Sequence, residues 1–256
     1  MRISRLPGSI LASLFLSPLV FFGVTAQAAE MQPPAVLEVY QCNYNPGKGP
    51  KDLMAARDYY VKQAEKAGIT PEPSFIWNKI KGDAPIDFVW FTAHENLAAF
   101  GASMDAGNAA EALADVQGRF DAVADCSPGL ATITPTFQRV APGATGNVLI
   151  SAFTCFFNKG VSEADMGDLT SHVNGVFSAM GNNAPQASYM ISPITGANAA
   201  VRYLFSTFEN ATAWTSFVGA ILASPDGQSL MRHRNAVLDC SSSLWGGEMV
   251  IGTLAN

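Results

Sequence analysis

The sequence predicts an α+β protein made of two tandem copies of one unit, and three observations support this prediction. The four cysteines form two pairs of nearly equal spacing, Cys42 with Cys126 and Cys155 with Cys240. Other segments recur at almost the same offset, and both copies show the same order of strand-like and helix-like patterns. Chance does not place a cysteine pair and a matching motif at one offset, so we infer an internal duplication.

The recurring segments set the register between the two copies. The offset is 113 residues at the first cysteine and 114 at the second. The longest match aligns WFTAHEN at 90–96 with LFSTFEN at 204–210. Aspartate precedes and serine follows the second cysteine in both copies, and aromatic residues flank the first cysteine at the same distance.

Each copy is predicted to begin with a strand and a helix. The strands at 36–44 and 148–157 carry the first cysteines and are rich in β-branched and aromatic residues. In the second copy the spacing of Ser162 and Asp165 is typical of a capping box, and an apolar stripe then runs to Gly181. A similar stripe in the first copy ends at Gly68, a residue that favours a helix C-terminus.

Two extended segments, a broken helix and a short last strand complete each copy. The extended segments are 74–79 and 87–91, matched by 187–192 and 200–205 in the second copy. The last strands are predicted at 130–135 and 245–251. The resulting order, βαββαβ, is that of the ferredoxin-like split βαβ unit.

This topology favours one disulfide pairing among the three that four cysteines allow. The first and last strands of a ferredoxin-like unit are neighbours, so a cysteine in the first can reach a cysteine just before the last. The predicted bridges are therefore Cys42–Cys126 and Cys155–Cys240. Each closes a long loop and should contribute about 3–5 kcal/mol in the chain-entropy model.

The N-terminal segment has the pattern of a secretory signal peptide. Arg2 and Arg5 precede an apolar run at 10–24, and Ala26-Gln27-Ala28 fits a cleavage site. We expect a signal peptide at 1–28, repeats at 29–135 and 148–256, and a linker at 136–147. If the signal peptide is cleaved, we expect an exported protein, periplasmic or secreted, with no membrane span remaining. The alternative is that the segment stays uncleaved as a membrane anchor.

Composition argues against several functional classes. Hydrophobic residues make up 48% and charged residues 14%, which favours a packed globule. The net charge of −6 argues against a nucleic-acid partner, because such binding needs clustered Lys and Arg. The basic spot at 232–234 is interpreted as solvated surface. No C-x-x-C pair or zinc-spaced histidine is present, and exported cysteines favour disulfides over metal ligation.

The element order in both copies, together with the strand-to-helix segments FTAHEN at 91–96 and FSTFEN at 205–210, resembles the dimeric α+β barrel superfamily. In that superfamily two ferredoxin-like units, usually separate chains, join their sheets into one barrel. The resemblance implies that this tandem chain builds the barrel alone, like the fused arrangement of some haem-binding relatives.

Candidate site residues are few. Glu95 and Glu209 recur, but Thr92-x-x-Glu95 and Ser206-x-x-Glu209 have capping-box spacing, so a helix start is favoured over catalysis. The three histidines, His94, His172 and His233, do not recur in the other copy, and haem ligation by one of them is the minor alternative.

Strand alternation suggests residues that line a barrel cavity. If Cys42 faces the helices, Gln41 and Asn43 face the barrel, as does Thr154 in the second copy. These polar groups, with Trp90 as an aromatic wall, are the predicted cavity-lining residues, and an ordinary packed core is the alternative.

No catalytic or cofactor motif is present, so no catalytic residue and no cofactor is assigned. The preferred hypothesis is a non-enzymatic module, monomeric or homodimeric, that binds a small apolar ligand or another protein. The alternative is an α+β-barrel enzyme such as a haem-dependent or cofactor-free oxygenase, on the resemblance of fold.

Overall fold

The computed structural model describes residues 35–140, 147–196 and 201–252. The predicted signal peptide at 1–28 and part of the predicted linker lie outside the described residues. Among the helices in the described ranges, none is long and apolar enough to cross a membrane.

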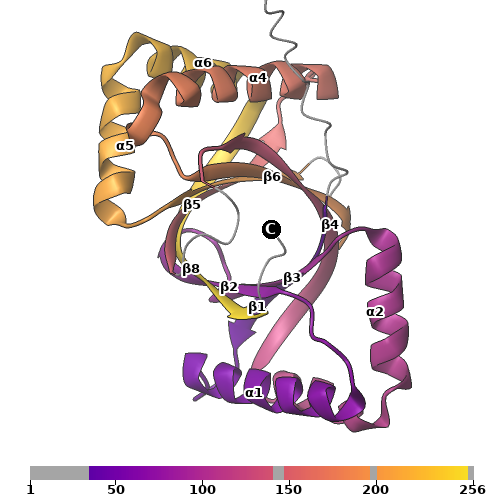
Figure 1. Cartoon of the computed structure of the whole chain (residues 1–256). Helices are drawn as coiled ribbons and strands as arrows, with labels where there is room; N and C mark the ends of the chain where they lie inside the picture. Colours follow the sequence, from indigo (N-terminus) through magenta and orange to yellow (C-terminus); the bar gives the residue numbers. More distant parts are fainter. Residues whose placement is uncertain (1–34, 141–146, 197–200, 253–256) are drawn as a thin grey trace, which may run out of the picture. The chain divides into compact units, whose positions relative to one another are not determined.

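Eight antiparallel strands form one closed barrel, as the fold class predicted (Figure 1). The strands run in the order β1-β3-β2-β8-β5-β7-β6-β4 around the barrel, so each copy contributes one four-stranded sheet. The two sheets join where β2 pairs with β8 and where β4 pairs with β6. The strands are β1 (Ala35–Tyr44), β2 (Ser74–Gly82), β3 (Phe88–His94), β4 (Ala124–Gln138), β5 (Val148–Phe157), β6 (Ala187–Thr195), β7 (Val201–Phe208) and β8 (Leu238–Ile251).

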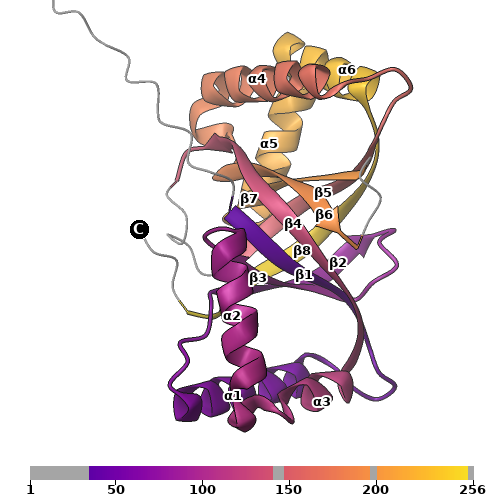
Figure 2. The ribbon, with the colours of Figure 1, turned by 90° about the vertical axis from the view of Figure 1, so that its right-hand side faces the viewer.

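The helices lie outside the barrel, those of the first copy on one side and those of the second copy on the opposite side (Figures 1 and 2). Their bounds are α1 (Pro50–Ala67), α2 (Leu97–Ala109), α3 (Val116–Asp121), α4 (Glu163–Met180), α5 (Ala211–Ala223) and α6 (Pro225–Val237), with short 3₁₀ turns at Glu111–Leu113 and Gly181–Asn183. Each sheet therefore has one face toward its helices and one toward the barrel interior, and both faces are apolar.

The predicted disulfides are present, but each second cysteine lies within the last strand rather than before it. Cys42 pairs with Cys126 across β1 and β4, and Cys155 pairs with Cys240 across β5 and β8, with a Cα–Cα distance of 4.1 Å in both bridges. The last strands hold 15 and 14 residues and are thus longer than predicted. Pro128, Gly129 and the serines at 241–243 have weak strand propensity, and only pairing with a neighbouring strand keeps them extended.

One predicted helix start is confirmed and two use a different residue. Ser162 and Asp165 form the expected capping box at α4. At α2 and α5, however, the caps are Asn96 and Asn210, whose side chains accept hydrogen bonds from the backbone N–H groups three residues on. The prediction of capping boxes at Thr92 and Ser206 was wrong, because both residues still belong to the preceding strands.

Candidate functional site

The barrel strands and the helices of the second copy form three cavities of similar size. Two are at opposite ends of the barrel interior and have volumes of about 310 Å³ each. The third, about 300 Å³, lies between the outer face of the second copy's sheet and helices α4, α5 and α6. We name them the barrel-mouth cavity, the far-end cavity and the helix-layer cavity, respectively.

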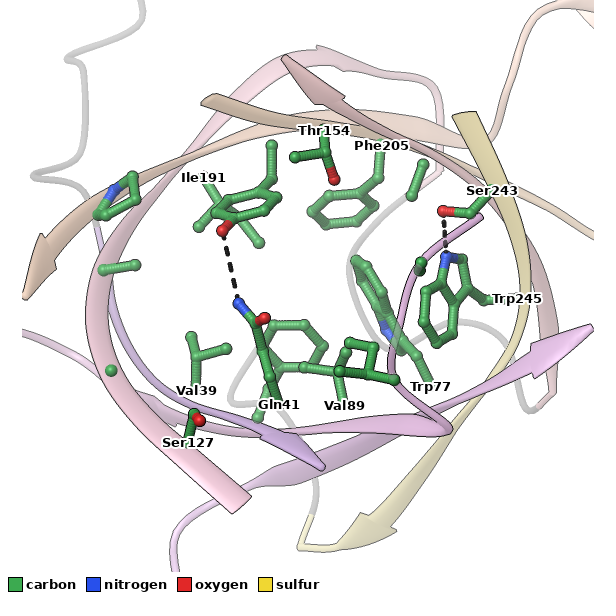
Figure 3. A pocket seen from close by; sticks show the side chains of 18 of the residues that line it. Val39, Gln41, Trp77, Val89, Ser127, Thr154, Ile191, Phe205, Ser243 and Trp245 are labelled. Atoms are coloured by element: carbon green, nitrogen blue, oxygen red, sulfur yellow. Dashed lines mark hydrogen bonds between the residues drawn. The ribbon is translucent and has the colours of Figure 1, made fainter. Parts of the chain in front are cut away.

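The barrel-mouth cavity contains two of the residues predicted to line a cavity (Figure 3). Gln41 of β1 and Thr154 of β5 occupy equivalent positions in the two copies, and both side chains point into the barrel. The Gln41 side-chain amide donates a hydrogen bond of 3.4 Å to the Tyr203 hydroxyl on the opposite sheet. Trp77, Phe91 and Phe205 separate this cavity from the far-end cavity.

The other two predicted residues lie elsewhere. Asn43 is exposed near the end of β1, beyond the barrel-mouth cavity. Trp90 points toward the helices of the first copy, because its neighbours Val89 and Phe91 point into the barrel and successive strand residues alternate.

The helix-layer cavity has apolar walls and a floor in which serine hydroxyls lie among apolar side chains. Outward-facing residues of the sheet, among them Ser151, Ser188 and Ser206, form the floor, and the Ser188 and Ser206 hydroxyls are 2.6 Å apart. The walls come mainly from apolar side chains of the three helices: Met166, Leu169, Val173, Phe177, Trp214, Phe217, Val218, Ile221, Leu222, Leu230 and Met231.

At two positions the first copy packs aromatic side chains where the second copy lines the helix-layer cavity. Trp90 packs edge-to-face against Phe120, with ring centroids 5.8 Å apart. The counterparts in the second copy are Leu204 and Arg234, which both line the helix-layer cavity. Beside them the first copy has Glu38, bonded to the Tyr40 hydroxyl at 2.5 Å, where the second copy has the small Ser151.

Arg234 is the charged residue among those lining the helix-layer cavity. Its guanidinium carbon lies 5.0 Å from the centroid of the Phe153 ring, and its Nε and Nη2 atoms donate to the Asn235 side chain. Burial lowers the pKa of Arg234, because a low-dielectric surrounding disfavours the charged form. The sequence indicated only a solvated basic spot here; the mismatch with Phe120 across the copies is the signal that could have identified Arg234.

The histidines lie outside all three cavities. His172 of α4 and His233 of α6 face each other, with their Nδ1 atoms 3.0 Å apart. His94 is buried at the end of β3 against Phe100, and its Nε2 atom is 3.9 Å from a carboxylate oxygen of Glu38.

The cavity-lining residues do not fit a haem held by a side-chain ligand. Haem iron in proteins is bound by histidine, cysteine thiolate, tyrosine, or methionine beside histidine. The four cysteines are in disulfides, and no histidine lines the helix-layer cavity. Tyr189 borders it, but the ring of Tyr189 stacks on Phe205 and lines the far-end cavity. Only the thioethers of Met166 and Met231 remain, without a histidine beside them.

Comparisons with known proteins show the fold. No protein-family model matches the sequence, and no curated protein matches it. A candidate monooxygenase from Fusobacterium nucleatum subsp. nucleatum has a TM-score of 0.55 at 12% identity, over 88% of this chain and 98% of that one. An anthrone oxidase-like protein has a TM-score of 0.50 at 13% identity, over 88% and 97%. A candidate chlorite dismutase has a TM-score of 0.51 at 10% identity, over 85% and 95%.

These similarities show the predicted α+β barrel fold and correct one functional expectation. The preferred hypothesis had been a non-enzymatic module. The proteins that share the fold are described as enzymes or as enzyme-like, so the comparisons favour the alternative, an α+β-barrel enzyme, over that hypothesis.

Proposed function

We propose that the protein is an oxygenase without a side-chain-ligated haem, and that it oxidises an apolar aromatic compound with an acidic C–H or O–H group. The substrate site is the helix-layer cavity. The observation that carries the proposal is Arg234, a half-buried cation in an apolar cavity, at the position where the first copy has Phe120 packed on Trp90. The fold of the candidate monooxygenase and of the anthrone oxidase-like protein supports the reaction class.

The shape and lining of the cavity indicate the substrate's ring system. Its volume of about 300 Å³ is near the lower end of the range for small-molecule sites. Aromatic walls such as Phe177, Trp214 and Phe217 favour contact with a flat ring system. The serine hydroxyls on the floor supply hydrogen bonds to oxygen substituents.

The charge of Arg234 indicates that the bound compound becomes an anion. Within the described ranges, the side-chain acceptor of Arg234 is the neutral amide oxygen of Asn235, and no carboxylate is within ion-pair distance. A half-buried cation without a counter-charge is costly, and a phenolate or enolate in the cavity would neutralise it. The guanidinium would thereby lower the pKa of the bound substrate.

The reaction follows from that anion. Loss of a proton next to a carbonyl or phenol gives an electron-rich carbon that reduces O₂ and forms a C–O bond. The resulting hydroperoxide loses water, so that R₂CH₂ + O₂ gives R₂C=O + H₂O. Arg234 holds the anionic oxygen. The first proton leaves to solvent, because the residues that line the cavity include no carboxylate and no histidine.

An oxygen-uptake assay with anthrone as the probe tests this proposal. The wild-type chain should consume O₂ and form the quinone, and Arg234→Gln should lower kcat/KM by about 100-fold, as expected for loss of one preorganised donor. Arg234→Lys should retain part of the rate, since it keeps the charge. Arg232→Gln is the matched control, because Arg232 is an exposed residue of the same helix and should leave the rate unchanged.

A packing transplant tests the location. The double variant Leu204→Trp/Arg234→Phe places the first copy's pair in the second copy and should abolish turnover while retaining the fold by circular dichroism. Thr154→Trp, in the barrel-mouth cavity, should leave turnover unchanged. Turnover that survives both the transplant and Arg234→Gln would refute the proposed site. A Soret shift on hemin addition that disappears in His172→Ala or His233→Ala would refute the haem-free chemistry.

A further inference from the structure

The barrel-mouth cavity is a second site that the proposed reaction does not use. Arg234, Ser188 and Ser206 do not line it. Its walls come from all eight strands, so both copies are needed to build it.

Several aromatic rings line the barrel-mouth cavity. The Trp77 ring centroid lies 4.5 Å from that of Phe91 and 4.6 Å from that of Phe205, and together these rings form the cavity base. Trp245 stands at one side (Figure 3), and Tyr203 also lines the cavity. Such flat, polarisable walls favour a planar aromatic ligand through stacked or edge-to-face contacts.

The two copies differ here in a way that leaves the cavity open. Tyr203 stands where the first copy has Val89, and Trp245 stands where it has Ala131. Both copies thus supply large residues, and together with the smaller lining residues they leave about 310 Å³ unfilled.

The polar groups that face this cavity are neutral and have capacity to spare. The Gln41 amide can take part in up to four hydrogen bonds, but within the described ranges its side chain makes one, the 3.4 Å contact to Tyr203. Thr154 points into the same space (Figure 3). The charged residue in the lining, Asp83, is exposed in the loop between β2 and β3. A buried charged ligand would therefore lack a side chain of opposite charge. An uncharged ligand with a single polar group could form a hydrogen bond with Gln41.

We infer that the barrel-mouth cavity binds a small, flat, uncharged aromatic compound, and that Gln41 and Tyr203 recognise its one hydrogen-bonding group. Trp77 and Phe205 contact the ring, and Gln41 accepts from or donates to the polar substituent. This site is independent of the oxygenase reaction and would remain if that proposal failed.

Binding of 5-fluoroindole, followed by ¹⁹F NMR and calorimetry, tests this inference. The wild-type chain should bind the probe saturably. Thr154→Trp, which fills the cavity, should weaken binding at least about tenfold, a loss that corresponds to about 1.4 kcal/mol. Ser206→Leu is the matched control, because it fills part of the helix-layer cavity and should leave 5-fluoroindole binding unchanged.

A second variant keeps the inference testable if Thr154→Trp fails to fold. Gln41→Met keeps the side-chain volume and removes the amide, so it should weaken 5-fluoroindole binding by about two- to tenfold, the range of one net hydrogen bond. Binding of naphthalene, which has no hydrogen-bonding group, should not change in Gln41→Met. Absence of saturable binding by the wild type, or weakening by Ser206→Leu but not by Thr154→Trp, would overturn the inference.

Discussion

Arg234 and its counterpart Phe120 illustrate what one residue decides in a duplicated chain. Both follow the same pattern of buried neighbours, since Val116 and Val123 in the first copy match Leu230 and Val237 in the second. Phe120 completes an aromatic core with Trp90, whereas Arg234 places a charge beside a cavity. From the sequence alone, Arg234 is predicted to be solvated. The pattern of apolar residues shows which side of the helix is buried, but it does not show where the core ends.

Gly227 is a residue at which two helices approach too closely for a side chain. A Cβ atom there would lie 2.2 Å from the Ile221 carbonyl oxygen and 2.7 Å from the Ile221 Cα atom. Because these are backbone atoms, Gly227→Ala should destabilise the protein by about 1–3 kcal/mol, as overpacking does. Gly219→Ala is the control, since its Cβ would meet nothing within 4 Å, and it should be neutral or slightly stabilising. Urea denaturation of both variants at pH 7 measures the difference; equal stabilities would contradict the close approach.

The partly buried hydroxyl of Tyr44 should make the folded protein less stable at alkaline pH. Burial, and to a lesser extent the charge of Asp87, raises the pKa of Tyr44 from 10.0 to about 12. The unfolded chain therefore releases this proton at lower pH than the folded chain does, and stability falls as pH rises from 10 toward 12. Tyr44→Phe should lose less stability over this window than the wild type and should match it in slope below pH 9. Urea denaturation at pH 8 and pH 11 tests this; the same alkaline loss in both proteins would exclude Tyr44 as a contributor.

At the scale of the element, local signals gave the order of strands and helices but misplaced several ends. The first strands and the start of α4 match the predictions, because their apolar patterns and caps lie within one segment. The last strands begin earlier than predicted, since pairing of β4 with β1 and of β8 with β5 keeps weak strand formers extended. Strand pairing joins residues that are far apart in the sequence, so no local sequence pattern predicts it.

The N-terminal cap of α2 can be tested against the capping box that the sequence suggested. The structure assigns the cap to Asn96, whereas the capping box would use Glu95. The Asn96 side chain accepts a hydrogen bond of 3.0 Å from the Ala99 N–H. Asn96→Ala should therefore cost about 0.5–2 kcal/mol. Glu95→Ala should change stability little, because Glu95 is exposed and is not part of the cap. Thermal melting of the two variants decides between them, and a larger loss for Glu95→Ala would restore the capping-box interpretation.

At the scale of the whole molecule, the fused chain allows the two halves of the barrel to differ. A barrel made of two identical chains would repeat every residue, so a Gln–Tyr pair would occur twice and an arginine could not be confined to one helix layer. In this chain the copies keep the same disulfide and the same strand order while their cavities diverge. The structural difference between the copies is possible because each copy has its own sequence within one chain.

The shared barrel also predicts one cooperative unfolding transition. The sheets of the two copies pair along both seams, β2 with β8 and β4 with β6. Phe137 at the end of β4 also packs on Phe177 of α4, with ring centroids 5.5 Å apart, so the first copy's last strand completes the second copy's core. Far-UV circular dichroism and tryptophan fluorescence should therefore report coincident urea transitions. Two separated transitions would show that the copies unfold independently.

The sequence by itself determined the duplication, the cysteine pairing and the βαββαβ order, because each depends on spacing and periodicity along the chain. It also indicated that Gln41 and Thr154 face a barrel, since strand alternation is local. Only the tertiary structure decided that Trp90 faces the helices, that Arg234 borders a cavity, and that Gln41 meets Tyr203. These facts depend on which side chains of distant elements share a space, and on whether their volumes fill it, and neither is encoded in any single segment.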